Sequence, residues 1–137
     1  MTLTPEQADR ILADNLAPWV RELGLTVEAV DGDRAVLRLP WSGRLAREGG
    51  ALSGQALMAA ADTATVIAVA AARGGYGPMT TVQQSTSFQR AVVGADVLIE
   101  AVVTKLGRRT AFADITLTEA GSGELAARAS TVYALLG

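Results

Sequence analysis

Residues 56–72 read ALMAAADTATVIAVAAA, a run of small and apolar side chains interrupted by one carboxylate, Asp62. The run is long enough for several helical turns, and the sequence Arg-Gly-Gly at residues 73–75 is typical of a helix end. A helix that is apolar on every side has to be covered on most of them. We therefore expect one long helix, from about Ser53 to Ala72, at the centre of the fold, with a sheet over part of it and a partner subunit over the rest.

The segments before this run predict a second helix and a hairpin. Thr4 and Pro5 are the residue types favoured at a helix N-cap and at the first helical position. Apolar residues then recur at helical spacing until Gly24, with Pro18 as a kink point. Two alternating runs joined by an Asp-Gly-Asp turn follow, and they predict a β-hairpin from residues 25–30 and 35–39.

The segment after the long helix predicts the rest of the sheet. Four strand-like runs are separated by glycine-containing turns, and alternate residues in the second and third of them are apolar. The runs cover residues 80–90, 96–106, 109–119 and 125–136. Helix, hairpin, long helix and antiparallel meander together predict an α+β fold. One domain over residues 1–137 then has a single curved sheet wrapped around a single long helix.

Composition narrows the chemistry that this chain performs. Its 137 residues include no cysteine and no histidine, and the formal net charge is −2. These absences exclude disulfides, thiol nucleophiles and a Ser-His-Asp triad, and we expect no metal site and no cofactor. The weak negative charge does not favour a nucleic-acid partner. Acid–base chemistry is left to Asp, Glu, Tyr, Lys, backbone groups or water.

The long apolar run is also the stretch to consider as a membrane span. It is short for that role and rich in alanine, and an Asp at the centre of a spanning helix costs roughly 2.5–3.5 kcal/mol. A buried helix fits the run better, so we expect no membrane partner. The N-terminal sequence, MTLTPEQADR, lacks the basic and apolar segments of a signal peptide, and we expect a cytoplasmic protein.

Asp62 is the first candidate for chemistry, because a charged group in an apolar helix is costly unless it is paired or hydrogen-bonded. In such a setting a carboxylate suits a general base or a nucleophile. The alternative is a structural carboxylate, satisfied by the neighbouring hydroxyls of Thr63 or Thr65 or by a backbone amide. Helix geometry alone leaves these two interpretations equally open.

Three further segments carry polar groups that suit a site. The helix start at residues 53–55 offers unpaired amides and the positive end of the helix dipole. Ser53 by itself is more typical of an N-cap, and no histidine is present to activate it as a nucleophile. Hydroxyl and amide side chains fill much of residues 81–90 and suit a polar ligand, a partner strand or water. A basic turn at residues 105–109 suits phosphate groups, although such turns are common on protein surfaces.

These pieces together resemble the hotdog-fold thioesterases, and within them the PaaI-like branch that acts on acyl-coenzyme A. That branch has the pattern Asn-x-x-Gly-x-x-His-Gly-Gly, followed by Ala-Asp-Thr-Ala on an apolar helix. This chain has REGGALSGQ at residues 47–55 and Ala-Asp-Thr-Ala at residues 61–64. The family's later strand pattern of Thr/Ser-Val, Phe/Tyr and Arg is matched at residues 81–90. The resemblance extends over residues 27–136.

By this resemblance, the chain is a thioesterase in which Asp62 attacks the thioester carbonyl or activates water against it. The Gly54 amide polarises that carbonyl, and the Thr81 hydroxyl helps to position the water. The family builds its site from two subunits, which implies a homo-oligomer, either a dimer or a dimer of dimers, with acyl-CoA as its substrate. Related proteins contact the nucleotide phosphates at the places of Lys105, Arg108 and Arg109.

The chain departs from the family pattern around the helix start. Ser53 replaces the histidine, Arg47 the asparagine and Gln55 the second glycine, and Glu48 lies beside Arg47. We expect these four residues to contact the substrate. The replacements favour a second hypothesis, a hotdog protein that binds acyl-CoA or another ligand without hydrolysing it. A hotdog hydratase or dehydratase is less favoured, since those relatives pair a histidine with an acidic residue.

Overall fold

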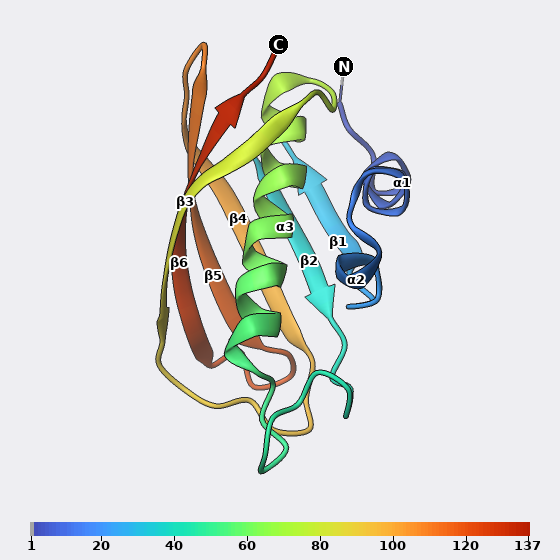
Figure 1. Ribbon diagram of the computed structural model, residues 1–137, viewed down its shortest axis with the longest axis vertical. Helices are drawn as coiled ribbons and strands as arrows, with labels where there is room; N and C mark the ends of the chain where they lie inside the picture. The colour runs from blue at the N-terminus through green and yellow to red at the C-terminus, as the bar shows by residue number, and fades with distance from the viewer. Residues whose placement is uncertain (1) are drawn as a thin grey trace.

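In the computed structural model, which describes residues 2–137, one long helix lies against a six-stranded antiparallel sheet (Figure 1). The helix, α3 (Gly54–Arg73), follows the stretch expected from the sequence. The predicted α+β architecture, one curved sheet around one central helix, is confirmed. The strands are β1 (Thr26–Asp31), β2 (Arg34–Leu39), β3 (Met79–Phe88), β4 (Val97–Leu106), β5 (Thr110–Glu119) and β6 (Leu125–Leu135).

The order of the strands across the sheet differs from the expected meander. The order is β1-β2-β4-β5-β6-β3, so β4, β5 and β6 form a meander, whereas β3 pairs with β6. The expectation that all four strands after α3 form one meander is therefore wrong for β3. The reason is that β4 pairs with β2, the second strand of the hairpin. The chain between β3 and β4 crosses below the sheet in Figure 1, and β3 is left at the edge.

The core lies between α3 and the inward face of the sheet. Ile99 of β4 and Leu117 of β5 are fully buried there, and residues alternate between buried and more exposed along both strands. Buried side chains occur along most of α3. By length and composition α3 could cross a membrane, but 61% of the stretch concerned is buried within the fold. Burial in the core thus accounts for its apolar character.

Both ends of α3 have the capping groups that the sequence predicts. Ser53 is the N-cap, and its hydroxyl accepts a hydrogen bond from the Ala56 amide at 3.2 Å. Gly74 ends the helix with φ at 81°, a left-handed conformation that glycine adopts without strain. These caps place Gly54 in the first turn of α3.

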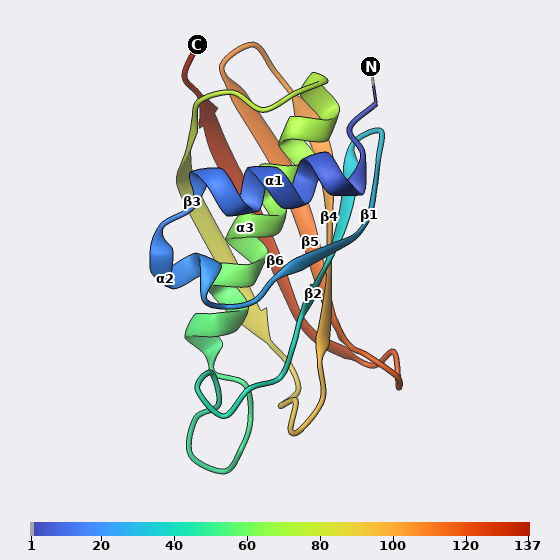
Figure 2. The same ribbon diagram turned by 90° about the vertical axis from the view of Figure 1, so that its right-hand side faces the viewer.

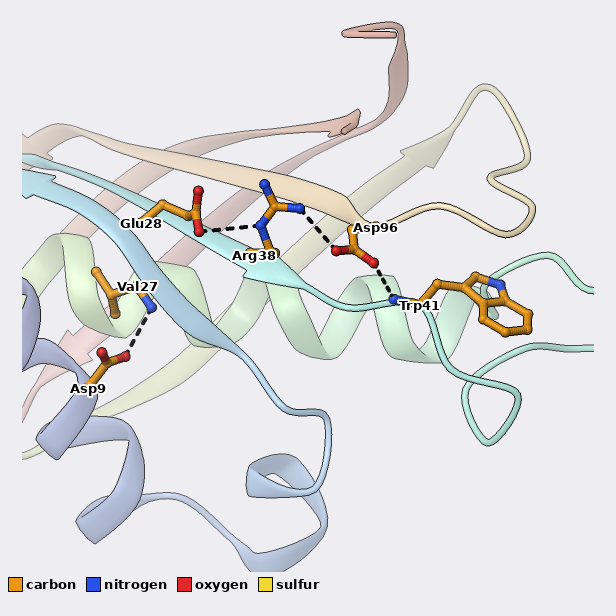
Figure 3. Close-up of polar contacts among 6 residues, drawn as sticks. All are labelled: Asp9, Val27, Glu28, Arg38, Trp41 and Asp96. Carbon is orange, nitrogen blue, oxygen red and sulfur yellow. Dashed lines mark hydrogen bonds and ion pairs between the residues drawn. The ribbon is translucent and has the colours of Figure 1, made fainter. Parts of the chain in front are cut away.

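The N-terminal segment forms two helices rather than one kinked helix. α1 (Pro5–Asn15) begins with the expected Thr4 cap, and α2 (Pro18–Arg21) begins at a proline, which interrupts helical hydrogen bonding. α1 runs crosswise to α3 in Figure 2 and packs beside β1. The Asp9 carboxylate accepts a hydrogen bond from the Val27 amide at 3.0 Å, which ties α1 to β1 (Figure 3).

A second polar anchor fixes the loop that leads from β2 to α3. The Asp96 carboxylate accepts hydrogen bonds from the Trp41 amide at 2.8 Å and from the Arg38 guanidinium at 3.0 Å (Figure 3). The hydrogen bond from the Trp41 amide, and then Arg38, lower the pKa of Asp96. Arg38 also pairs with Glu28 of β1. The loop therefore starts from a fixed point on the sheet.

Candidate active site

The Asp62 carboxylate, near the middle of α3, is held by two hydroxyl groups from the sheet. The Thr81 hydroxyl of β3 donates to Oδ1 at 2.8 Å, and the Tyr133 hydroxyl of β6 donates to the same atom at 2.6 Å. Tyr133 Oη also lies 2.9 Å from the carbonyl oxygen of Asp62. The other carboxylate oxygen, Oδ2, has no hydrogen-bond partner among residues 2–137. The half-buried carboxylate is thus hydrogen-bonded through one oxygen and unbonded at the other.

The neighbouring hydroxyls on α3 do not satisfy Asp62. Thr63 and Thr65 each donate to a helix carbonyl oxygen one turn earlier, at 2.8 and 3.0 Å. Thr65 also pairs with Thr131 of β6 at 2.9 Å. The interpretation in which Thr63 or Thr65 satisfies the carboxylate is therefore wrong. Its partners come from β3 and β6, which only the tertiary structure brings to α3.

Tyr133 is the member of this group that the sequence does not single out. Its side chain is 2% exposed, and burial followed by the charge of Asp62 raises the pKa of its hydroxyl. The hydroxyl therefore stays protonated, and remains a donor, throughout the neutral range. A signal was available: Tyr133 shares the buried face of β6 with Thr131, and a buried tyrosine hydroxyl needs a hydrogen-bond partner.

At the start of α3, the Gly54 amide is available to a ligand. Gly54 is the first helical residue, so its N–H has no acceptor within the helix, and no other described residue accepts from it. Ser53 acts as the N-cap, which confirms the capping interpretation of that residue. The free N–H group lies at the positive end of the helix dipole, where developing negative charge is stabilised.

A cavity of about 390 Å³ lies beside Gly54 and is lined in part by Arg47, Phe88 and Arg90. The Arg90 guanidinium forms ion pairs with two glutamates, whereas that of Arg47 contacts the Glu48 carbonyl oxygen at 3.3 Å. Arg47 and Gly54 thus line the same cavity. The other predicted contact residues at the helix start are not among the residues that line the cavity: Glu48, Ser53 and Gln55.

Within one chain, Gly54 and Asp62 are too far apart to act on the same carbonyl group. They are eight residues apart on α3, which corresponds to about 12 Å along the helix axis. A carbonyl oxygen about 3 Å from the Gly54 amide would leave its carbon beyond the reach of the Asp62 carboxylate. A single chain therefore has two separate groups of polar residues. One is Asp62 with Thr81 and Tyr133, and the other is Gly54 with Arg47.

The basic turn between β4 and β5 lies at the end of the molecule where α3 finishes, opposite the end where α3 starts (Figure 1). Its three cations are exposed, and none forms an ion pair within the described part of the chain. A cavity of about 670 Å³ adjoins two of them and the last residues of the chain. The cations are Lys105, Arg108 and Arg109.

The polar segment at residues 81–90 includes most of the open edge of the sheet. One side of β3 pairs with β6, and the other side has no strand beside it among residues 2–137. Val82 and Phe88 are 61% and 49% exposed, and Met58 on the adjacent face of α3 is 39% exposed. Apolar side chains along an open strand edge are typical of a surface that another chain covers.

The groups assembled here suit acyl-transfer chemistry. They comprise a carboxylate with one free oxygen, two hydroxyls that orient it, and an unused amide at a helix start. Within residues 2–137 no three Asp or Glu side chains are grouped so as to hold a metal ion.

Comparison with known proteins identifies the family and the fold. A family model described as "Thioesterase superfamily" matches residues 49–126, more than half of the chain. Among solved structures, thioesterase superfamily member 2 of zebrafish is 26% identical, with a TM-score of 0.86 over 98% of this chain and 100% of that chain. A mutant of the phenylacetic acid degradation protein PaaI of Thermus thermophilus is 27% identical, with a TM-score of 0.77 over 88% of this chain and 100% of that chain.

A more distant structure shares the fold. A hypothetical thioesterase protein of Streptococcus pneumoniae, solved with coenzyme A, is 18% identical, with a TM-score of 0.75 over 82% of this chain and 86% of that chain. A search of the curated proteins finds no match. The matched family segment contains Gly54, Asp62 and Thr81, and the sheet and helix form the predicted hotdog fold. The chain belongs to the thioesterase superfamily.

Proposed function

We propose that this protein hydrolyses an acyl-CoA thioester, with Asp62 as general base or nucleophile and the Gly54 amide polarising the thioester carbonyl. The observation that carries the proposal is the Asp62 carboxylate, held through Oδ1 by Thr81 and Tyr133 and unbonded at Oδ2. Membership of the superfamily supports a thioester as the bond that is cleaved. The unused N–H group at the start of α3 supports the role of Gly54.

The reaction has two forms that these groups support. In the general-base form, Oδ2 of Asp62 takes a proton from water while the water oxygen attacks the carbonyl carbon. The Gly54 amide stabilises the negative charge on the carbonyl oxygen. The C–S bond then breaks, CoA leaves as a thiol once its sulfur is protonated, and the acyl group leaves as a carboxylic acid. In the nucleophilic form, Oδ2 attacks the carbonyl carbon, the C–S bond breaks and CoA leaves as a thiol once its sulfur is protonated. Water then hydrolyses the resulting anhydride, which releases the carboxylic acid and regenerates Asp62.

The proposal includes a homodimer in which the open edges of β3 meet. The separation of about 12 Å between Gly54 and Asp62 along α3 supports a site that takes one group from each chain. The unpaired side of β3 and the exposed Val82 and Phe88 support this edge as the interface. A dimer of such dimers is compatible with the same composite site.

The substrate is proposed to be a CoA ester. The exposed cations of the β4–β5 turn have no carboxylate partner among the described residues, so they are available to phosphate groups. A protein of the same fold from Streptococcus pneumoniae was solved with coenzyme A, which supports a CoA ester as the substrate. The cavity beside Gly54 and Arg47 is the proposed location of the thioester. The phosphates are then proposed to meet the basic turn of the second chain, since the turn of the same chain lies at the other end of α3 (Figure 1).

Replacement of Asp62 by asparagine tests the proposal, because it removes the base and keeps an oxygen that accepts hydrogen bonds from Thr81 and Tyr133. On a panel of aryl, short-chain and long-chain acyl-CoA esters, we expect Asp62→Asn to lower kcat by about 100- to 10,000-fold. Release of the CoA thiol is the readout, and the chain adds no background because it has no cysteine. Asp114→Asn, at an exposed position of β5, is the control that should keep wild-type turnover. Equal turnover in Asp62→Asn and wild type would remove Asp62 from the mechanism.

A protein that binds acyl-CoA without hydrolysing it is the second candidate. The observation that favours it is the replacement of the family residues by Arg47, Ser53 and Gln55 at the helix start. Titration calorimetry with a thioether analogue of acyl-CoA distinguishes the two candidates. Saturable binding, without turnover of any ester in the panel, supports the binding protein, and absence of binding contradicts both candidates.

A further inference from the structure

We infer that Tyr133 is a positioning residue: its hydroxyl, together with that of Thr81, ties Oδ1 of Asp62 so that Oδ2 is the oxygen that meets water or substrate. The inference rests on the proposed function, in which the Asp62 carboxylate reacts. Tyr133 lies beneath the carboxylate in the core, so it acts through Asp62 and not by touching the substrate.

The placement of both donors on a single oxygen gives them this role. An unrestrained Asp carboxylate rotates broadly about χ2, so its two oxygens exchange places. Here the hydroxyls of Thr81 and Tyr133 reach Oδ1 from two strands, at 2.8 and 2.6 Å. Hydrogen bonds to a charged group are stronger than those between neutral groups. Two of them on Oδ1 hold the carboxylate in one orientation and leave Oδ2 as the unbonded oxygen.

The pairing of β3 with β6 brings the two hydroxyls to one place. Thr81 is directly opposite Tyr133, and the register shifts immediately after Thr81. Gln84 faces α3 as well, since its amide donates to a carbonyl oxygen of that helix at 3.1 Å. In a regular strand, residues three apart face opposite sides of the sheet. The β-bulge at Val82 is therefore what turns the Thr81 hydroxyl inward, beside that of Tyr133.

Tyr133 is suited to this role because its hydroxyl stays a donor. Burial first, and then the Asp62 carboxylate, raise the pKa of the hydroxyl, so it does not ionise in the neutral range. Tyr76 is the other titratable side chain that acts on it among the described residues, and it raises the same pKa. The Thr81 hydroxyl lowers the pKa of Tyr133, but burial and the charge of Asp62 outweigh it. Tyr133 therefore stays protonated while Asp62 takes part in proton transfer.

Kinetic measurement of Tyr133→Phe tests this role, because phenylalanine keeps the buried ring and removes the hydroxyl. With an acyl-CoA that the wild type hydrolyses, we expect kcat to fall by about 10- to 100-fold with little change in KM, as for the loss of a hydrogen bond to a charged group. We also expect the acidic limb of the pH–rate profile to move to higher pH. The reason is that the charged form of Asp62 loses a donor that favours it over the neutral form.

Thr131→Val is the matched control. Thr131 is on β6, two residues from Tyr133, and its buried hydroxyl pairs with Thr65 of α3 at 2.9 Å. The valine variant therefore removes a buried hydroxyl between the same two elements without touching Asp62. We expect it to keep the wild-type kcat and pH–rate profile. Tyr133 has no positioning role if Tyr133→Phe also keeps both, or if Thr131→Val shows the same loss and the same shift.

A fluorinated tyrosine keeps the test valid even if Tyr133→Phe does not fold. The chain has two tyrosines, so a Tyr76→Phe protein carries Tyr133 alone. Growth on 3-fluorotyrosine then makes the Tyr133 hydroxyl a stronger donor with little change in volume. Relative to unlabelled Tyr76→Phe, the acidic limb should move to lower pH. If the acidic limb of the pH–rate profile does not move, Tyr133 has no positioning role.

Failure of this role and failure of the proposed function give different results. Wild-type turnover in Asp62→Asn would overturn the proposed function. An inactive Asp62→Asn beside an unimpaired Tyr133→Phe would overturn only the role of Tyr133. In the Asp62→Asn background, Tyr133→Phe should cause no further loss of residual activity, because it acts through that carboxylate.

Discussion

The residues of the candidate site reflect a chain without histidine, in which chemistry is left to carboxylates, hydroxyls and backbone groups. Asp62 supplies the carboxylate, and Thr81 and Tyr133 orient it through a single oxygen. Gly54 supplies an N–H group that no described residue accepts from. Side-chain replacements test the roles of the carboxylate and the hydroxyls. The role of the Gly54 N–H group is tested by replacing Gly54 with proline, which has no amide hydrogen.

Gly54→Pro removes the amide hydrogen at a position where proline is tolerated, the first residue of a helix. Ser53 has ψ at 150°, which suits a residue that precedes proline, so α3 should start at the same place. We expect kcat to fall by about 100- to 1,000-fold, as for the loss of one oxyanion donor.

Gly54→Ala is the matched control for the proline variant. A Cβ atom at Gly54 approaches the exposed ring of Phe88 to 3.3 Å, and both variants introduce this contact. Alanine keeps the N–H group, so we expect it to retain most of the activity. Equal losses of kcat in the two variants would assign the effect to the Phe88 contact and contradict the role of the amide.

Among the secondary-structure elements, β3 has the largest effect on the site. It lies at the sheet edge beside β6, and its bulge turns Thr81 toward α3. The loop before α3 has the next largest effect, because it leads to the amide of Gly54. Asp96 anchors this loop by accepting hydrogen bonds from the Trp41 amide and the Arg38 side chain.

Asp96→Asn tests this anchor through stability. The pKa of Asp96 is lowered in the folded protein, chiefly by the Trp41 amide, so the carboxylate stabilises the fold above its ordinary pKa of 3.8. That stabilisation is lost as the pH falls below this value and the carboxylate becomes protonated. At pH 7 we expect Asp96→Asn to lower the free energy of unfolding by about 1 kcal/mol, a modest value because the side chain is 34% exposed.

Urea unfolding of wild type and Asp96→Asn at pH 7 and at pH 3 is the measurement. The difference between the two proteins should be smaller at pH 3 than at pH 7, because below its ordinary pKa Asp96 of the unfolded chain binds a proton and the advantage of the folded carboxylate declines. A difference of the same size at both pH values would contradict the lowered pKa as its cause.

For the whole molecule, the spacing along α3 decides what one chain provides. Gly54 lies at the start of the helix and Asp62 more than two turns later, so under the proposed function one chain offers two halves of a site. The open edge of β3 is where a second chain would add its own halves. A two-fold symmetric pair then contains two composite sites, each with Gly54 from one chain and Asp62 from the other.

Mixing two inactive variants tests the composite site. In a dimer of one Asp62→Asn chain and one Gly54→Pro chain, one site carries both changes and the other carries neither. Co-refolding of equal amounts should therefore restore about one quarter of the wild-type kcat, since about half of the dimers are mixed and each has one intact site. Turnover of the mixture is compared with that of each variant refolded alone. No recovery, in a mixture that light scattering and mass spectrometry show to contain mixed dimers, would contradict the composite site.

Much of the fold is predictable from the sequence because local patterns of apolar, capping and turn residues define the helices and strands. The apolar run, Ser53 and Gly74 predict α3 almost to its ends, and alternation predicts each strand to within a few residues. The place of β3 in the sheet is not predictable in this way, since periodicity defines a strand but not its partner. The effect of Pro18 is not predictable in this way either, because a kinked helix and two separate helices have the same local sequence pattern.

The residue types of the candidate site follow from the amino-acid sequence alone: no histidine, one carboxylate within the apolar helix, and a glycine at the helix start. Spacing along the chain related Gly54, Asp62 and Thr81 to a known pattern. Which hydroxyls hold Asp62 depends on the folded arrangement, because Tyr133 of β6 and Thr81 of β3 are far from Asp62 in the sequence and are brought together by the pairing of these two strands. The physical reason is that helix and strand patterns depend on neighbours in sequence, whereas a buried hydrogen bond depends on which distant strands meet.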